Sequence, residues 1–197
     1  MKTFISVVVV LLIVLIASGW YVLSRGVSAR VQPTRIEALF ARTVRHLAIP
    51  HANRNAVNPI PPSEDVLREA MAHFADHCAT CHANDGSGKT VIGKGLYPKP
   101  PDLRQAETQQ LTDGELFYII ENGVRFTGMP AFGGSGNEHQ EDSWELVRFI
   151  RHLPQITDEE IAQMKELNPK TPADLKEEEE MRQFLEGGEG VEHKHHH

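Results

Sequence analysis

The run Cys78-Ala79-Thr80-Cys81-His82 constrains this chain more than any other feature. A C-x-x-C-H run is the attachment signature of a c-type haem, in which the two thiols add to the vinyl groups and the histidine gives the proximal imidazole to the iron. Both cysteines of the chain lie in this run, which leaves none for a disulfide or a second zinc pair. We therefore expect one covalently attached haem c, held by Cys78, Cys81 and His82.

Two other kinds of site use paired cysteines. A C-x-x-C redox dithiol needs no histidine and is expected in a βαβ context, which the sequence does not indicate. A structural zinc site needs four ligands in two spaced pairs, and no second pair with that spacing follows. Both interpretations are therefore weaker than haem attachment.

Residues 4–23 are almost entirely apolar and carry no charge. Twenty helical residues extend about 30 Å, the thickness of the hydrocarbon core of a bilayer. Trp20 and Tyr21 lie near the far end, where aromatic rings favour the interface. The alternative is a cleaved signal peptide with a small-residue site around Ala17 and Gly19, but such apolar regions are usually about 7–15 residues long. We predict an uncleaved signal-anchor over residues 1–24.

Charge is distributed unevenly along the chain. Residues 1–62 have a net charge of +6 and residues 63–197 of -13, which together give the net charge of -7. A basic segment beside a membrane and an acidic remainder argue against a nucleic-acid partner. Only Lys2 precedes the apolar span, so the positive-inside rule alone would place the C-terminal side in the cytoplasm. Because haem is normally attached to C-x-x-C-H outside that membrane, we give the motif priority over the charge count. Five arginines closely follow the span: Arg25, Arg30, Arg35, Arg42 and Arg45.

Residues 25–62 form a predicted juxtamembrane helix and a Pro-rich linker. Thr34-x-x-Glu37 is a capping box, and helical spacing then places five apolar residues on one face. This amphipathic helix could lie on anionic lipid, dock onto a partner subunit or pack on the following domain. Residues 49–62 contain four prolines and would reach roughly 40 Å if extended, which suggests a tether that lets the domain swing. The five apolar residues are Ile36, Leu39, Phe40, Val44 and Leu47.

Residues 63–153 are predicted to form an all-α domain with long loops. Ser63 and Thr112 begin helices, Gly123 ends the second of these, and a third helix runs from about residue 141 to 152 before Pro154. No stretch shows convincing strand alternation. Long loops count against stability in a domain of about 90 residues, but a buried haem would supply much of the missing core.

Residues 154–197 are predicted to be a solvated, acidic helical appendage with a His-rich tail. Thr157-x-x-Glu160 and Thr171-Pro172 begin two further helices, and Gly187-Gly188 ends the second. The last residues, 193–197, contain four histidines that could bind a divalent metal, or could be a tag remnant or an unstructured end.

A six-coordinate haem needs a second axial ligand, for which Met129 is the candidate. It lies in a loop between two predicted helices, 47 residues after His82, and Pro130 restricts the chain beside it. Met71, Met164 and Met181 lie within predicted helices and are interpreted as packing residues. A His/Met pair raises the potential of the haem and suits electron transfer, whereas a bis-histidine pair would give a lower potential.

Together these motifs resemble class I cytochromes c, of the membrane-anchored, monohaem kind. The resemblance covers residues 63–153 and implies a cytochrome c fold in which the first and last core helices cross. It implies that His82 and Met129 bind the iron, and that a carbonyl between Pro98 and Pro101 accepts the proton of the far His82 nitrogen. The matching segments are residues 78–82, 85–88, 96–103 and 128–132, with Trp144.

The resemblance implies one-electron transfer rather than enzyme catalysis, with no catalytic residues and no small-molecule substrate. We expect a carrier in a bacterial cytoplasmic membrane, crossing it once, with the haem domain on the periplasmic or outer side. Its expected partners are membrane lipid and redox proteins, such as a quinol-oxidising complex and a terminal oxidase or reductase. The alternatives are a fixed haem subunit of a larger membrane oxidoreductase and a haem-based ligand sensor. Five basic residues could ring the haem edge, or be ordinary surface residues: Lys89, Lys94, Lys99, Arg104 and Arg125.

Overall fold

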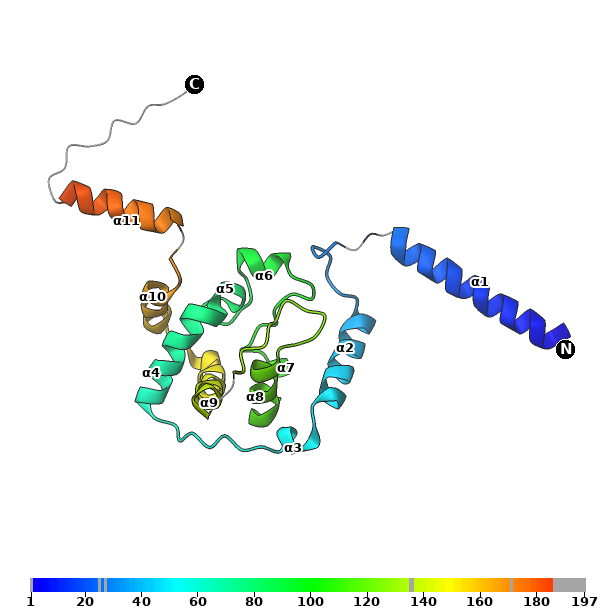
Figure 1. Cartoon of the computed structure of the whole chain (residues 1–197), viewed down its shortest axis with the longest axis horizontal. Coiled ribbons are helices and arrows are strands. Elements are labelled where there is room, and N and C mark those ends of the chain that lie inside the picture. The colour runs from blue at the N-terminus through cyan, green and yellow to red at the C-terminus, as the bar shows by residue number, and fades with distance from the viewer. Residues whose placement is uncertain (1, 25, 27, 135–136, 171, 186–197) are drawn as a thin grey trace, which may run out of the picture.

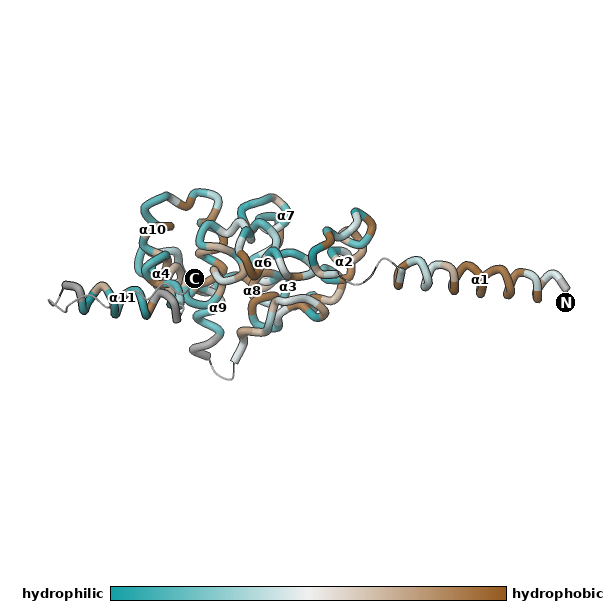
Figure 2. Tube along the Cα trace, turned by 90° about the horizontal axis from the view of Figure 1, so that it is seen from above, coloured by the Kyte–Doolittle hydropathy of each residue, from teal (hydrophilic) through white to brown (hydrophobic). Residues whose placement is uncertain are grey.

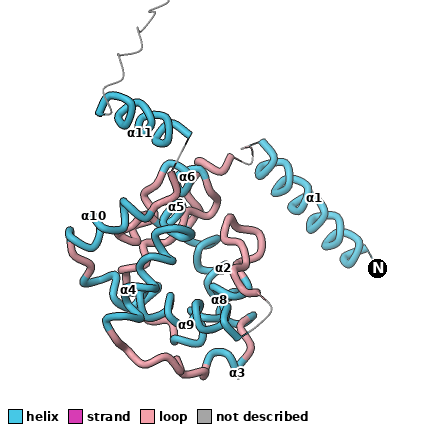
Figure 3. The backbone as a smooth tube through the Cα atoms, turned by 60° about the vertical axis from the view of Figure 1, so that its left-hand side comes forward, coloured by secondary structure: helices cyan, strands magenta, loops and turns pink. Residues whose placement is uncertain are grey.

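The computed structural model describes residues 2–24, 26, 28–134, 137–170 and 172–185. Over these residues the chain consists of helices and loops and contains no strand, as predicted (Figure 3). Short turns of π-helix, η1 (Phe74–Cys78), and of 3-10 helix, η2 (Leu153–Gln155), interrupt the α-helices. The α-helices are α1 (Lys2–Ser24), α2 (Arg35–Ala48), α3 (His51–Arg54), α4 (Glu64–His73), α5 (Ala79–His82), α6 (Val91–Gly95), α7 (Ala106–Gln109), α8 (Asp113–Asn122), α9 (Asn137–His152), α10 (Asp158–Leu167) and α11 (Pro172–Leu185).

Local capping signals place the helix starts where the sequence predicted them. Thr34, Thr112 and Thr157 each accept a hydrogen bond from the backbone of a glutamate three residues on, and that glutamate bonds back to the threonine backbone. Ser63 caps α4 in the simpler way, through its side chain alone. The largest difference is at α9, which begins at Asn137, four residues before the predicted start.

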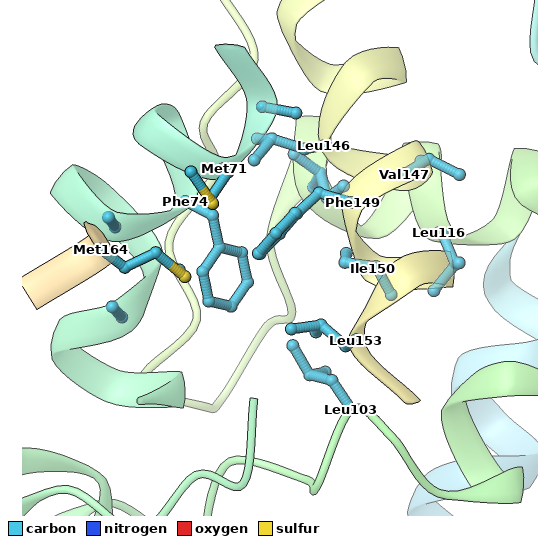
Figure 4. Close-up of a cluster of buried hydrophobic side chains, with 14 of the residues drawn as sticks. Met71, Phe74, Leu103, Leu116, Leu146, Val147, Phe149, Ile150, Leu153 and Met164 are labelled. Carbon is cyan, nitrogen blue, oxygen red and sulfur yellow. The ribbon is translucent and has the colours of Figure 1, made fainter. Parts of the chain in front are cut away.

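The core lies where α4 and η1 meet α9, so the first and last helices of the domain pack together as the resemblance implied. The rings of Phe74 and Phe149 are 5.0 Å apart at the centre of this contact (Figure 4). Trp144 stacks on Phe117 of α8 with ring centroids 4.1 Å apart, which ties the third large helix to the same core. Burial of these aromatic side chains is a main source of the stability of the domain.

Residues 49–62 pack along the domain and do not form the predicted swinging tether. Ile49 is buried, and the Asn58 side chain donates to the Trp144 carbonyl over 2.9 Å. Arg148 Nε donates to the Ile60 carbonyl over 2.9 Å. A Cβ on Gly114 would lie 1.8 Å from the Asn53 carbonyl oxygen, so α3 meets α8 backbone to backbone. Residues 49–62 therefore form a strap along the domain, which these contacts with α8 and α9 hold in place.

The two helices after the domain differ in their packing. Met164 of α10 is fully buried beside Phe74 and Met71, so α10 packs on the domain where the sequence had indicated a solvated helix (Figure 4). Helix α11 is solvated, with its described side chains exposed. Gly187-Gly188 and the His-rich tail lie outside the described residues.

Helix α1 projects from one side of the domain and α11 from the other (Figure 1). The described side chains of α1 are exposed, and the helix is hydrophobic over most of its length (Figure 2). From Thr3 to Ser24 it is long and apolar enough to cross a membrane, by length and composition, and a signal sequence would meet the same criteria. It therefore fits the predicted anchor.

Candidate functional site

Cys78, Cys81 and His82 lie together at the C-terminal end of the first core helix. Cys78 is the last residue of η1, and α5 carries Cys81 and His82 through the next turn. Both thiols are free. Burial raises the pKa of Cys78 to about 12 and also raises the pKa of Cys81. A redox dithiol requires a lowered thiol pKa, so this environment disfavours the redox interpretation.

His82 has a neutral imidazole whose Nδ1 atom is buried. Burial lowers the pKa of His82 to about 4, and interaction with the Pro101 carbonyl acts against this lowering. Among the described residues, no group makes a well-formed hydrogen bond with Nδ1. A neutral imidazole with one nitrogen directed at a backbone carbonyl is the form in which histidine binds a metal. Of the two predicted prolines, Pro101 is thus the one whose carbonyl reaches His82. Pro98 is exposed and follows a cis peptide bond with Tyr97.

The segment that carries Pro101 is held over His82 by Arg104. This guanidinium donates to both carboxylate oxygens of Asp102, over 2.9 and 2.8 Å, and to Asp85 over 3.1 Å. Two backbone bonds close the same loop, from Gly88 to the His82 carbonyl (2.7 Å) and from Leu103 to the Gly86 carbonyl (2.8 Å). The residues just after the C-x-x-C-H run are thereby clamped to those just after Pro101.

Two glycines allow close backbone approach in this loop. Gly88 has φ +71°, and a Cβ there would lie 2.7 Å from the Pro100 carbonyl oxygen. A Cβ on Gly93 of α6 would lie 2.7 Å from the Cys81 carbonyl oxygen. Larger residues would therefore push Pro100 and α6 away from the cysteine–histidine turn.

Met129 lies half-buried in the loop that follows α8. The Val124 amide donates to the Met129 carbonyl over 3.1 Å, and the Met129 amide donates to Thr127 Oγ1 over 3.1 Å. Gly123, with φ +64°, ends α8 directly against this turn, because a Cβ there would lie 2.7 Å from the Met129 carbonyl oxygen. A Cβ on Gly128 would likewise lie 2.6 Å from the Leu96 side chain, so the methionine loop meets the segment that leads to Pro101.

The other described methionines occupy different positions. Met71 and Met164 are buried in the core, as predicted, and Met164 fills the space beside Phe74 (Figure 4). Met181 of α11 is exposed, so it is a surface residue and not the packing residue that the sequence predicted. Met129 is thus the one described methionine that lies in a loop.

Residues 65–150 match a protein-family model described as "Cytochrome C oxidase, cbb3-type, subunit III". This part of the chain is a c-type cytochrome domain. The match covers the cysteine–histidine turn, the Arg104 clamp and the Met129 loop. A cytochrome c domain implies a covalently bound haem c and haem-based electron transfer.

The described residues of this cytochrome domain fit a haem. Two thiols and a neutral imidazole lie in one short turn, with the Pro101 carbonyl close to the imidazole. Among the described residues, no group of three or more His, Cys, Asp or Glu side chains could hold a metal ion, which leaves His82 without a competing set of ligands. A bound haem would supply one-electron redox chemistry, while the protein would supply its attachment and its surroundings.

Two of the five basic residues predicted at the haem edge have internal partners in the cytochrome domain. Arg104 binds Asp85 and Asp102, and Lys99 Nζ donates to the Ala29 carbonyl over 2.9 Å and to the Leu96 carbonyl over 3.3 Å. Lys89, Lys94 and Arg125 are exposed. The Arg104 clamp was not predicted, because Arg104 was interpreted as a residue of the haem edge or the surface, although the Asp102-x-Arg104 spacing was a visible signal.

Proposed function

We propose that this chain is a membrane-anchored, monohaem c-type cytochrome that carries single electrons through a haem bound by His82 and Met129. The observation that carries the proposal is the position of His82, a neutral imidazole with a buried Nδ1 atom, directly after two half-buried free cysteines. Cys78 and Cys81 hold the group covalently, and the Pro101 carbonyl orients His82. Met129 completes the coordination from a loop that its own backbone bonds hold in shape.

Oxidation and reduction in such a site require no proton donor and no nucleophile. The Arg104–Asp102 pair holds the His82 side in one geometry, which reduces the rearrangement between the two redox states. Phe74, whose ring centroid lies 6.5 Å from that of His82, packs on Phe149, so the apolar core lies beside the imidazole and excludes water there. Partners are redox proteins that dock weakly at the exposed haem edge, among them a quinol-oxidising complex and a terminal oxidase or reductase. No small-molecule substrate is involved, and the chain acts as a carrier, not an enzyme.

The proposed location is a bacterial cytoplasmic membrane, crossed once by α1, with the cytochrome domain on the periplasmic or outer side. The apolar length of α1 supports the anchor, and the attachment chemistry of the cysteine–histidine turn supports the outer side. A fixed subunit of a larger membrane oxidoreductase is a second candidate, favoured by the match to an oxidase-subunit family. Stable copurification with other subunits in mild detergent would identify the fixed subunit, and isolation as a single chain would identify the carrier.

The test is an optical spectrum of the purified protein, oxidised and reduced, together with acid–organic extraction of the haem. We expect haem that resists extraction, in a ratio of one per chain, with the far-red sulfur-to-iron band in the oxidised form. Retained haem without that band would replace Met129 by another ligand and favour a bis-histidine or ligand-sensing protein. Absence of covalent haem from a host that can attach it would overturn the proposal.

A further inference from the structure

Helix α2 turns its charged side toward the cytochrome domain. Arg42 pairs with Glu107 over 2.7 Å, and His46 Nδ1 lies 2.8 Å from the buried carboxylate of Glu115. Arg45 lies between these contacts, and burial lowers the pKa of its guanidinium. Residues 42, 45, 46 and 49 share one helix face, and that face ends at the buried Ile49.

The opposite side of α2 is apolar and exposed. At about 100° per residue, its five apolar side chains centre roughly opposite the face that contacts the domain. In relative exposure they are Ile36 80%, Leu39 67%, Phe40 70%, Val44 46% and Leu47 69%.

This orientation is the reverse of what a helix on a globular domain adopts. Such a helix buries its apolar stripe in the core and exposes its charges. A contiguous exposed apolar face marks an interaction site. The interpretation that α2 packs its apolar face on the domain, which the sequence left open, is therefore wrong.

The position of α2 in the chain indicates what covers this face. Ten residues separate Ser24, the end of α1, from Arg35, the start of α2, and can span at most about 35 Å. Lys99 Nζ holds the Ala29 carbonyl against the domain over 2.9 Å, only five residues after α1 ends. If α1 spans a bilayer, the domain and α2 are therefore held close to the surface of that bilayer.

We propose that α2 is an interfacial helix whose apolar face inserts into the same bilayer that α1 crosses, so that the cytochrome domain is held in one orientation on the membrane. Helices of this kind lie in the interface plane with the apolar face buried about 5–10 Å. Because Arg42 and Arg45 face the domain, apolar burial supplies most of the binding, which therefore depends little on anionic lipid. The proposal rests on the part of the proposed function that makes α1 a membrane span.

The test is a depth measurement by spin labelling of the full-length holoprotein in phosphatidylcholine vesicles. Thioether formation removes the thiols of Cys78 and Cys81, so a single introduced cysteine carries the nitroxide. Labels at Leu39→Cys and Leu47→Cys report on the apolar face of α2. Val57→Cys is the matched control, because Val57 is an apolar residue that is 85% exposed outside α2. Leu12→Cys reports on α1. An unchanged haem spectrum verifies folding in every variant.

We expect the ratio of oxygen to nickel-chelate accessibility to be several-fold higher at Leu39 and Leu47 than at Val57, and unchanged when anionic lipid is added. If the labels on α2 have the accessibility ratio of the Val57 label while the Leu12 label is buried in the bilayer, the proposal is overturned and the anchor is left intact. A water-exposed label at Leu12 would instead overturn the anchor. Dipolar coupling between labels on α2, with shielding from both reagents, would assign the face to a second copy of the chain and also overturn the proposal.

Discussion

The two predicted axial ligands of the cytochrome domain are held in different ways. The His82 side is clamped by contacts between separate segments: Arg104 with Asp85, and the Gly88 and Leu103 amides with carbonyls across the loop. The described hydrogen bonds of residues 123–133, which form the Met129 side, stay within residues 119–133. The side that carries the covalent attachment is thus rigid, whereas the methionine side is a local turn at the surface.

This difference indicates which ligand would yield first. A turn held by local hydrogen bonds can open without unfolding the core, because few buried contacts depend on it. The exposure of Phe126, at 93% with φ 61°, shows how little the tip of this turn is packed. Exchange of the sixth ligand should therefore be easier than any change at His82, and the predictions below test this comparison.

The largest effect is expected from Cys81→Ser. The turn would lose one of its two attachment points, so the yield of haem that survives acid–organic extraction should fall to a small fraction of that of the parent chain. Thr80→Ala, at an exposed position in the same turn, is the control and should leave the yield unchanged. An undiminished yield in the serine variant would contradict the attachment role of the cysteines.

Met129→Ala should act on the other side of the haem only. Haem should remain covalently attached, while the far-red band disappears, the reduction potential falls and added imidazole binds readily. Met181→Ala is the control, because Met181 is exposed on α11. A parent-like spectrum in the Met129 variant would remove this residue from the coordination of the iron.

Gly88→Ala and Gly123→Ala form a matched pair across the comparison. Each glycine has a positive φ, and an added Cβ would lie 2.7 Å from a backbone carbonyl oxygen on its own side of the haem. Each variant should lose about 1–3 kcal/mol of unfolding free energy through strain. Only Gly123→Ala should speed imidazole binding. Equal rates in the two variants would show that the methionine side is no looser than the histidine side. Gly95→Ala, with no atom within 4 Å of the added Cβ, is the control.

The smallest expected effect is on the stability of the fold at acid pH. Hydrogen bonds from Arg104 lower the pKa of Asp102 below its ordinary value of 3.8. A lowered carboxyl pKa stabilises the fold above the unfolded pKa, and this contribution is lost as the pH falls below about 4. Arg104→Met should therefore flatten the pH dependence of the unfolding free energy between about pH 4 and 2. Parallel curves for parent and variant would exclude the clamp as a source of acid sensitivity.

Much of the helical architecture could be predicted from the sequence because its signals are local. The capping boxes at Thr34, Thr112 and Thr157 join atoms three residues apart, so they form wherever that spacing occurs. The start of α9 was predicted four residues too late, since the acidic residues from Glu141 were interpreted as its first turn. The cysteine–histidine turn was equally visible, since five consecutive residues carry its chemistry.

By itself the sequence determined the attachment turn, the loop that carries Met129 and the apolar helix at the N-terminus. Only the tertiary structure decided that Pro101 faces His82, that residues 49–62 are a strap and that the apolar side of α2 points outward. These features depend on pairs far apart in the chain: 86 residues separate Asn58 from Trp144, and 69 separate His46 from Glu115. Local spacing encodes contacts within a turn of helix, whereas the face that a helix turns to its neighbours is decided only when distant segments compete for the same surface.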